Sequence, residues 1–281
     1  MRIRGLGLLT VLLGTTLQLA KAATIQVYIA PPGVQADPLS GTEYRIASFN
    51  SPPVGNYDTL SVNEFGAYDT AGTVNGLRVQ NADQYGGASG SRYMTFGAQN
   101  GSAASIALTL STPRSYFGFW WSAGDANNGL TFVDVNGFVA RFSAADIVSV
   151  LSPSTGTVTA IDGTVYNNSS YYGNPNPPAG RNTREPYAFV MFFFTDTQVS
   201  RIIFDNAGST GTGFESDNHT VRTALPDVYQ PSVWVKTMEM VETPEPGTMA
   251  TVAGALVALG LLRGSRRSRA AGGAARDQRR A

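Results

Sequence analysis

The chain has 281 residues, with 20 basic and 20 acidic side chains, one histidine and no cysteine. The lack of cysteine excludes a disulfide framework, a thiolate metal site and a cysteine nucleophile, and a single histidine excludes a multi-histidine metal site. Only 14% of the residues are charged, whereas about 25% is usual for a soluble domain. Together with 31 glycines, this composition favours an extracellular, turn-rich β protein over a cytosolic helical one.

The charged side chains are unevenly distributed along the chain. Half of the basic residues lie before residue 22 or after residue 262, whereas residues 23–247 hold 10 basic and 19 acidic side chains, a formal charge of −9. Nucleic-acid recognition needs a basic footprint against phosphate. The acidic body therefore argues against nucleic acid as a partner, and it is compatible with cation binding or simply with solubility.

Residues 1–22 have the layout of a secretory signal peptide. Arg2 and Arg4 precede an apolar run at 6–19, and Ala20 and Ala22 supply the small residues of a cleavage site. A membrane-anchoring helix needs about 20 apolar residues, and this run is shorter and contains Thr and Gln. A cleaved signal peptide is therefore favoured over an uncleaved anchor.

A second apolar segment lies near the other end of the chain. Pro244, Glu245 and Pro246 precede an apolar stretch at 248–262, and an arginine-rich tail follows it. The prolines stop any preceding structure, the stretch can enter a bilayer, and the arginines hold the C-terminus on the cytoplasmic side. A span this short suits a segment that is recognised and then cut. The alternative is an ordinary C-terminal tail anchor.

The order of Pro244-Glu245-Pro246, apolar helix and arginine cluster closely resembles the PEP-CTERM sorting signal of Gram-negative bacteria over residues 243–269. The resemblance implies recognition by exosortase, a membrane protease-transpeptidase, with transient contact between the helix and the inner membrane. It also implies removal of the tail and export to the cell surface or extracellular matrix, where exopolysaccharide and biofilm matrix are made. The chain departs from the pattern only in an Ala/Gly/Arg-rich extension at 270–281.

We therefore expect a signal peptide at 1–22, one domain at 23–242 and a sorting signal at 243–281. The domain is predicted to be all-β, a single β-sandwich of jelly-roll type, because many short strands alternate with turn signals. Two small domains are the alternative. One short helix is expected at 143–149, with Ser143 as its N-cap. The expected strands lie at 25–29, 44–49, 93–96, 105–110, 116–121, 130–135, 138–142, 188–194, 201–204, 219–221 and 233–240.

Asn136 and Gly137 separate two of these strands. An Asn-Gly pair accepts positive φ at both central positions of a two-residue turn. The sequence therefore predicts a tight hairpin at this point.

Aromatic residues give the first candidate for binding. Trp120 and Trp121 must point to opposite faces of their strand. One is expected to fill the core, and the other either covers the second face of the sheet, which is favoured, or forms a platform on which a sugar ring stacks. Tyr171 and Tyr172, in a loop rich in Pro and Asn, are further candidate glycan contacts.

Oxygen-rich side chains give a second candidate, a structural calcium site. Calcium takes six to eight oxygen ligands, and Asp125, Asn127 and Asn128 cluster in one loop. Asx residues are also common turn formers, and that role is favoured here. Both interpretations stay open for Glu215 and Asp217, which alternation places on the same side of a strand.

Catalytic constellations are few. A glycosidase needs two carboxylates at a controlled separation, and Glu185 and Glu215 form a conceivable pair, but nothing in the sequence brings them together. A structural role for Glu185 is favoured. His219 is the single imidazole, and we expect a solvent-facing or hydrogen-bonding residue rather than a base. Neither a Gly-x-Ser-x-Gly elbow nor a phosphate-binding glycine loop occurs.

Segments 116–129, 185–190 and 213–221 resemble a group of exosortase-dependent surface proteins of uncharacterised biochemistry. The Phe-x-x-Asp-Asn-x-x-Val element at 214–221 also resembles the closing strand of jelly-roll carbohydrate-binding modules, which implies that Asp217 supports a structural calcium. The expected function is a non-enzymatic surface or matrix component that contacts extracellular polysaccharide. The alternatives are a glycan-active hydrolase that uses Glu185 and Glu215, and a purely structural coat or adhesion protein.

Overall fold

The structure is a computed structural model that describes residues 23–242 apart from 42, 98–100, 177–180, 208–211 and 226–232. The predicted signal peptide and the predicted sorting signal, with Pro244, Glu245 and Pro246, lie outside the described residues. Within the described ranges, no helix has the length and hydropathy needed to cross a bilayer.

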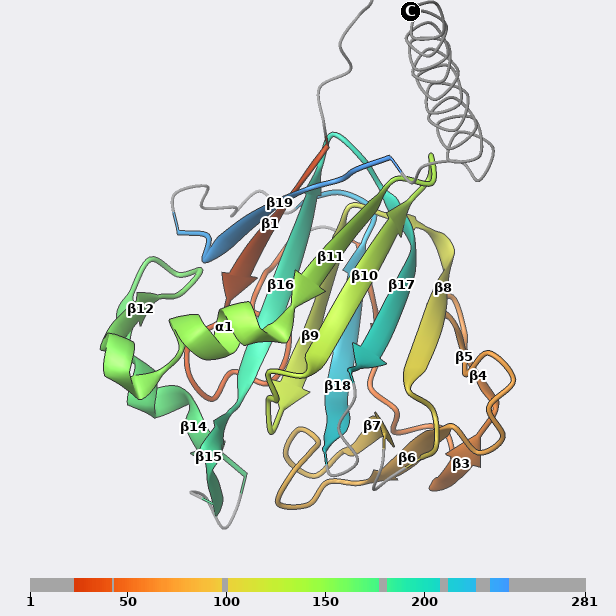
Figure 1. Cartoon of the computed structure of the whole chain (residues 1–281), viewed down its shortest axis with the longest axis horizontal. Coiled ribbons are helices and arrows are strands. Elements are labelled where there is room, and N and C mark those ends of the chain that lie inside the picture. Colours follow the sequence, from red (N-terminus) through yellow and green to blue (C-terminus); the bar gives the residue numbers. More distant parts are fainter. Residues whose placement is uncertain are drawn as a thin grey trace, which may run out of the picture.

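Two antiparallel sheets form the body (Figure 1). The larger contains, in order across the sheet, β19 (Lys236–Glu239), β1 (Thr24–Ile29), β16 (Ala188–Thr195), β9 (Tyr116–Ser122), β18 (Gly213–Arg222), β7 (Arg92–Gly97), β6 (Leu77–Asn81) and β3 (Gly55–Tyr57), and β2 (Tyr44–Ala47) also pairs with β18. The smaller contains, in order, β11 (Val139–Ser143), β10 (Asn128–Asp134), β17 (Val199–Asn206), β8 (Ser105–Arg114), β5 (Gly66–Asp69) and β4 (Thr59–Val62).

The remaining elements lie beside these sheets. They are α1 (Ala144–Val150), the 3-10 turns Pro153–Thr155 and Asn168–Tyr171, and two small ribbons, β12 (Thr157–Thr159) with β13 (Val165–Asn167) and β14 (Tyr172–Asn174) with β15 (Arg181–Pro186). Helix α1 and its cap residue Ser143 match the expectation, although Ser143 makes no side-chain cap hydrogen bond. The all-β expectation is confirmed.

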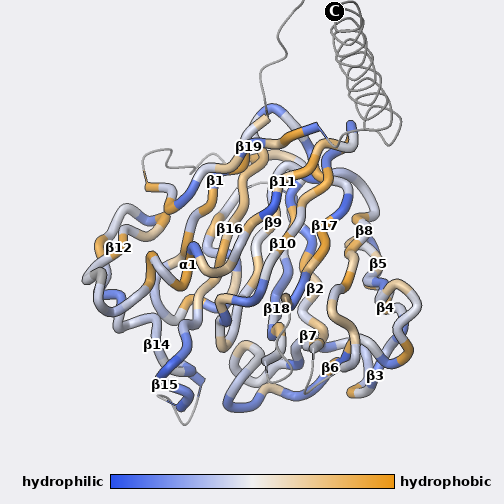
Figure 2. The backbone as a smooth tube through the Cα atoms, viewed as in Figure 1, coloured by the Kyte–Doolittle hydropathy of each residue, from blue (hydrophilic) through white to orange (hydrophobic). Residues whose placement is uncertain are grey.

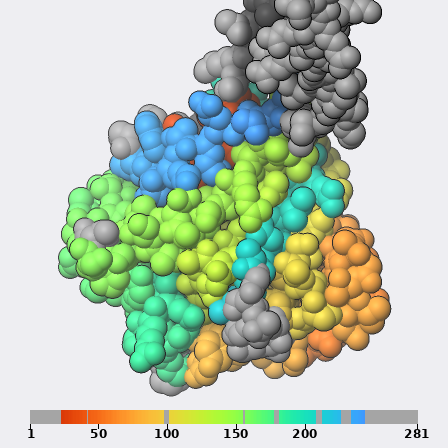
Figure 3. All heavy atoms as spheres, in the orientation of Figure 1, coloured from red at the N-terminus to blue at the C-terminus, as the bar shows by residue number. Residues whose placement is uncertain are grey.

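The two sheets pack face to face over an aromatic core. Alternation along each strand sends every second side chain inward, so Phe119 of β9 meets Phe204 of β17 at a ring-centroid distance of 6.4 Å. Phe132 of β10 lies 4.7 Å from Phe192 of β16. In the surface view, residues of β17 lie between those of β10 and β8, far from them in sequence (Figure 3). Burial of this core is the main stabilising contribution to the fold.

The larger sheet is also covered on its other side, which we call the outer face. A second buried cluster there includes Tyr28, Tyr116 and Phe193, with Leu39 and Ile161 packed on it from loops. A buried ion pair holds the loop at 30–41, because Arg222 lies 2.9 Å from Asp37 and both side chains are at most 4% exposed. Hydrophobic residues accordingly line β1 and β16, whereas β15 is strongly hydrophilic (Figure 2).

The two ends of the described chain leave the body together. Thr24 of β1 pairs with Glu239 of β19 and with Thr195 of β16. The antiparallel pairing of β16 with β9, from Phe193↔Tyr116 to Ala188↔Trp121, places the end of β9 at the opposite end of the sheet. Figure 1 shows β19 at one end of the molecule and β6, β7 and β15 at the other.

The predicted hairpin at Asn136 and Gly137 joins β10 and β11, but its turn differs from the prediction. Gly137 has a φ of 85°, whereas the φ of Asn136 is negative. The carboxylate of Asp134 explains the difference, because its Oδ1 accepts hydrogen bonds from the backbone N–H groups of Asn136 and Phe138 at 2.8 and 2.9 Å. The result is a three-residue loop that ends in a left-handed glycine.

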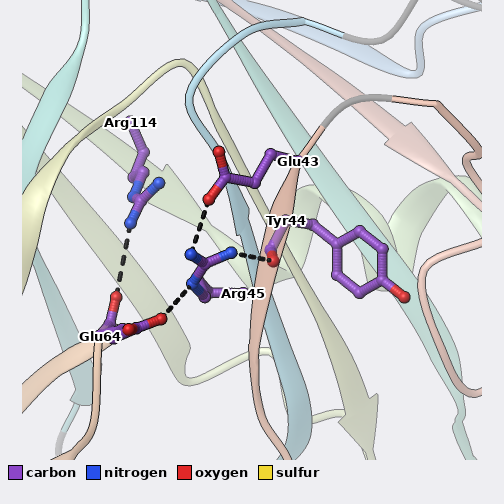
Figure 4. Close-up of polar contacts among 5 residues, drawn as sticks. All are labelled: Glu43, Tyr44, Arg45, Glu64 and Arg114. Atoms are coloured by element: carbon purple, nitrogen blue, oxygen red, sulfur yellow. Dashed lines mark hydrogen bonds and ion pairs between the residues drawn. The ribbon is translucent and has the colours of Figure 1, made fainter.

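A polar cluster joins β2 of the larger sheet to the turn between β4 and β5 of the smaller sheet (Figure 4). Arg45 contacts Glu43 at 2.6 Å and Glu64 at 2.8 Å, and the Arg114 guanidinium lies 3.5 Å from the Glu64 carbonyl oxygen. The carboxylates of this cluster are more than half exposed, so water and salt screen each ion pair and it contributes little to stability. The cluster therefore links the two sheets at the protein surface.

Candidate functional site

The outer face of β18 carries two acidic side chains at its start. Glu215 lies directly opposite Thr95 of β7 on one side and Ser122 of β9 on the other. Directly opposed residues of antiparallel strands share a face, so the three side chains form one row on the outer face. Asp217 follows two residues later on the same face, as alternation predicts.

Three further carboxylates lie near enough to Glu215 for their charges to affect its pKa. We call Asp83, Asp125, Glu185 and Glu215 the acidic cluster. Glu215 is only 7% exposed. Burial raises its pKa to about 8, and the negative charges of Glu185, Asp83 and Asp125 act in the same direction. Within the described chain, no ion pair joins a basic side chain to any of the four. The Glu215 carboxyl therefore holds a proton at neutral pH.

Two members of the acidic cluster accept hydrogen bonds from backbone N–H groups of their own loops. In the loop between β6 and β7, Asp83 Oδ1 accepts hydrogen bonds from the backbone N–H groups of Tyr85 and Gly86 at 2.8 and 3.0 Å. The Tyr93 hydroxyl also donates to Asp83 at 3.1 Å. After β9, Asp125 Oδ1 accepts from the backbone N–H of Asn127 at 2.8 Å. These two side chains shape loops while they contribute negative charge.

Glu185 and Glu215 accept no hydrogen bond from a backbone N–H of their own loop within the described residues. Glu185 lies on β15, where its Oε2 accepts a hydrogen bond from Asn182; burial raises its pKa and this hydrogen bond lowers it, with a net increase. The same Asn182 amide donates to the Tyr187 hydroxyl at 2.9 Å. No hydrogen bond of good distance and angle joins Glu215 to a described residue, although the Thr95 hydroxyl lies close enough to act as a donor and lower the Glu215 pKa.

Buried polar atoms without partners lie along the outer face of β18. Thr95 and Ser122 flank Glu215, and Trp120 lies opposite Asp217; Thr95 Oγ1, Ser122 Oγ and Trp120 Nε1 are buried and form no hydrogen bond within the described residues. Most buried polar groups in proteins have at least one partner, and leaving one unsatisfied costs about 1–3 kcal/mol. Their concentration beside one buried carboxyl marks this part of the outer face as the candidate site.

Asp217 has a different role from Glu215. Its Oδ2 accepts from the backbone N–H of Ala88 at 2.9 Å and from the Ser91 hydroxyl at 2.5 Å, and its Oδ1 accepts from the backbone N–H of Asn218 at 2.6 Å. Burial raises the Asp217 pKa to about 6, and these hydrogen bonds lower it. Asp217 therefore ties the loop between β6 and β7 to the sheet.

The expectation of a calcium site at Glu215 and Asp217 stays a prediction. Both oxygens of Asp217 already accept hydrogen bonds within the described residues, so a calcium ion there would have to share or displace them. Within the described ranges, no group of three or more acidic or histidine side chains is arranged to hold a metal ion.

His219 lies on the inner face of β18. The pairing of β18 with β9 shifts register between Asp217 and Thr220, so His219 is part of this irregular segment. It is fully buried; its Nδ1 is 2.8 Å from the Tyr68 hydroxyl and its Nε2 is 2.9 Å from Ser216 Oγ. Burial lowers its pKa to about 3. The expectation of a hydrogen-bonding residue is confirmed, and the solvent-facing alternative is excluded.

The predicted aromatic glycan contacts are mostly buried. Trp120 and Trp121 are 0% and 1% exposed, so the favoured interpretation, packing on both faces of the sheet, describes them. Tyr171 is 1% exposed, and its hydroxyl donates to the Ala30 carbonyl at 2.9 Å. A sugar ring needs an exposed aromatic face on which to stack, so these three residues are not available as platforms. Tyr172 is partly buried and lies on β14.

A polar cavity of about 270 Å³ adjoins the acidic cluster and shares Asp83 with it. It lies between the loop that follows β6 and the ribbon that contains β15. The cavity is lined by Asn81, Ala82, Asp83, Ser89, Gly90, Ser91, Asn176 and Arg181.

Sequence reasoning missed Asp83, Thr95 and Ser122. Asp83 resembles an ordinary turn residue before Gly86 and Gly87, and single hydroxyl residues in strands carry no signal of their own. Only the pairing of β7, β18 and β9 brings Thr95 and Ser122 to Glu215.

A search against models of protein families finds no match to this chain, and a search of curated proteins finds no matching relative. The function must therefore be argued from the site and from the sequence.

Proposed function

We propose that the protein is an exosortase-sorted, secreted component of the cell surface or extracellular matrix, and that it binds extracellular polysaccharide at the acidic cluster without catalysis. The observation that carries the binding proposal is the outer-face row in which a buried Glu215 lies between the unpartnered hydroxyls of Thr95 and Ser122. Saccharide hydroxyls both donate and accept hydrogen bonds, as this row requires.

The sorting part of the proposal rests on the sequence. A signal peptide at 1–22 and the PEP-CTERM-like segment at 243–281 flank the body, and Pro244, Glu245 and Pro246 precede the apolar stretch. In this proposal the body is a jelly-roll sandwich similar to carbohydrate-binding modules, exported by a Gram-negative bacterium through the inner membrane.

The geometry of the body suits this proposal. Thr24 and Glu239 pair with each other at one end of the larger sheet, and Glu215 pairs with Ser122 at the other end. With about 3.3 Å per residue along a strand, roughly 20 Å separates the two ends. A body held at a membrane through its chain ends would therefore present the acidic cluster away from that membrane.

A second function, glycoside hydrolysis, is favoured by one observation. Glu185 is the charged neighbour with the largest effect on the pKa of Glu215, which is about 8. A general acid must hold its proton at the working pH, and glycosidases pair such an acid with a second carboxylate. In this alternative Glu215 is the acid and Glu185 is the second carboxylate.

The test is affinity electrophoresis of the protein through gels that contain the host's own exopolysaccharide, together with an assay for new reducing ends. We expect retardation of the wild-type protein, loss of it in Glu215→Gln, and no new reducing ends. The matched control is Glu239→Gln, which makes the same substitution at an exposed residue at the opposite end of the sheet.

The other outcomes are distinct. New reducing ends that disappear in both Glu215→Gln and Glu185→Gln would establish the hydrolase. No retardation and no turnover would leave a purely structural coat or adhesion protein. Retardation that survives Glu215→Gln would place the binding site elsewhere.

The sorting proposal has its own test. Mass spectrometry of the secreted protein should find a C-terminus near the Pro244-Glu245-Pro246 motif, and deletion of the host exosortase should leave the tail in place. A secreted chain that ends at residue 281 would contradict it.

A further inference from the structure

We propose that the saccharide bound at the acidic cluster carries protonated amines, so that the ligand class is an amino-sugar polymer rather than a neutral or acidic polysaccharide. This inference rests on the proposed polysaccharide-binding function and names the substrate class of the same site.

The first argument is the charge of the site. The negative charges of Asp83, Asp125 and Glu185 act on the buried Glu215, and no ion pair with a basic residue of the described chain neutralises any of them. The segment 23–247 also has a formal charge of −9. This field repels a carboxylated or sulfated polymer and attracts a cationic one. A neutral polymer gains nothing from it.

The second argument is independent of charge. Thr95 Oγ1 and Ser122 Oγ, one on each side of Glu215, are buried and lack hydrogen-bond partners within the described residues. Both side chains are 0% exposed, and both point to the face on which Glu215 lies. Because both side chains are fully buried, a ligand reaches this row only when the side chains that cover it move aside. Its N–H and O–H groups then satisfy the two hydroxyls, whereas without a ligand the two hydroxyls stay unsatisfied.

The third argument concerns the size of the cation. The described residues contain no set of three or more acidic or histidine side chains close enough to share one metal ion. The four carboxyls come from four separate segments of the chain, so they are suited to a larger cation with several N–H donors. An ammonium group on a sugar ring meets this condition, and charge-assisted hydrogen bonds to carboxylates are the strong ones.

A lysine side chain of a peptide also carries an ammonium group. The saccharide is favoured because its ring hydroxyls sit beside its amine, and the site likewise places two unpartnered hydroxyls beside its carboxyl. A lysine has an apolar chain at that position, which would leave Thr95 and Ser122 unsatisfied.

A bound ammonium also changes the ionisation of Glu215. A positive charge beside a carboxyl favours its ionised form, so the ligand displaces the Glu215 proton near pH 7. The binding heat then depends on the ionisation enthalpy of the buffer, which provides a readout that a merely structural residue would not give.

The experiment is isothermal titration calorimetry on the full-length chain in detergent, with three probes of equal length: a glucosamine hexamer, an N-acetylglucosamine hexamer and hexalysine. We expect the glucosamine hexamer to bind, and the other two to bind at least about tenfold more weakly, since one charge-assisted hydrogen bond is worth about 1.5–3 kcal/mol. Glu215→Gln should weaken the glucosamine hexamer by about tenfold or more, whereas Glu239→Gln should change it less than about twofold.

Each remaining result has a definite meaning. Equal binding of the acetylated hexamer, or an unchanged affinity in Glu215→Gln, would overturn the amine assignment and leave polysaccharide binding standing. Equal binding of hexalysine would overturn the saccharide class. Binding of the glucosamine hexamer without retardation by any host polysaccharide would support the amine site and defeat the proposed function.

Discussion

The two faces of β18 differ in whether their buried polar groups form hydrogen bonds. On the inner face, His219 is surrounded by aromatic rings, and its two nitrogens contact Tyr68 and Ser216 at 2.8 and 2.9 Å. On the outer face, Glu215 lies between Thr95 and Ser122, and the hydroxyls of both neighbours have no partner within the described chain. The inner polar groups satisfy one another, whereas the outer ones do not.

This difference separates a structural site from a binding site. A satisfied network in a core specifies one packing arrangement, and it offers nothing to a ligand. A protein that leaves several buried polar atoms unsatisfied in one place gives up stability there, and such violations are expected at functional sites. This contrast is why we propose the outer face of β18 as the binding site, whereas the inner face is part of the packed core.

The largest expected effect is the pH dependence of stability at Glu215. Its folded pKa of about 8 lies above the ordinary value of 4.5, so the folded state keeps its proton longer than the unfolded state does. This contribution is complete below pH 4.5 and is lost as the pH rises through 8. At pH 9, Glu215→Gln should be more stable than wild type by up to about 5 kcal/mol.

Urea unfolding at pH 4 and pH 9 measures this effect. The two proteins should have similar midpoints at pH 4 and different ones at pH 9. Equal midpoints at pH 9 would mean that Glu215 is ionised without cost, and the contrast between the faces would disappear.

Removing an aromatic ring that packs against His219 from the opposite sheet should lower stability nearly as much. Phe204 is fully buried and stacks on His219 with ring centroids 5.3 Å apart. Phe204→Ala should lower the free energy of unfolding by about 3–5 kcal/mol through lost burial and a cavity. Val165→Ala, at a residue that is 61% exposed, is the control and should change it by less than about 0.5 kcal/mol.

Breaking the inner network should have an intermediate effect. Tyr68→Phe removes the tyrosine hydroxyl that contacts His219 Nδ1 and leaves that buried nitrogen unsatisfied, which costs about 1–3 kcal/mol.

His219 adds a pH dependence of stability that is opposite in sign to that of Glu215. Its folded pKa of about 3 lies below the ordinary 6.5, so its contribution is lost as the pH falls from 6.5 toward 3. Thermal unfolding between pH 3 and 7 would show both effects.

Removing a hydroxyl from the outer face should leave the stability of the protein almost unchanged. Ser122→Ala removes a hydroxyl that has no partner within the described residues, so stability should change by less than about 0.5 kcal/mol or rise slightly. Binding of the glucosamine hexamer should weaken. A loss of stability as large as that of Tyr68→Phe would show that Ser122 is part of the fold rather than the site.

Chelation of calcium should have the smallest effect. The carboxylate of Asp217 already accepts three hydrogen bonds, so a chelator should leave the melting temperature unchanged. A ligand that binds only the folded state raises the melting temperature. An increase with added calcium would support the predicted calcium site at Glu215 and Asp217.

Local patterns were sufficient for much of the fold. The expected strands at 105–110 and 116–121 lie within β8 and β9 because their apolar residues alternate or run continuously. The short strands β3 to β6 were missed, since segments such as Gly55–Tyr57 hold too few apolar residues to show a period. At Asn136 and Gly137 the hairpin was predicted, but the Asp134 carboxylate decided the turn.

The candidate site was predicted only in part, for a physical reason. Glu215 and Asp217 were identified as strand neighbours on one face, and that depends only on alternation. The row with Thr95 and Ser122 depends on pairing between strands that lie far apart in the chain, and Glu185, whose charge affects the Glu215 pKa, lies on a separate ribbon. No local pattern encodes that register.

The most direct test of the account is an NMR titration of the Glu215 carboxyl carbon, assigned through Glu215→Gln, with and without the glucosamine hexamer. We predict that the free protein titrates at a pKa of about 8 and that the hexamer lowers this value, because a cation beside the carboxyl favours its ionised form. A Glu215 that titrates near its ordinary value of 4.5, or one whose pKa the hexamer does not change, would contradict the account.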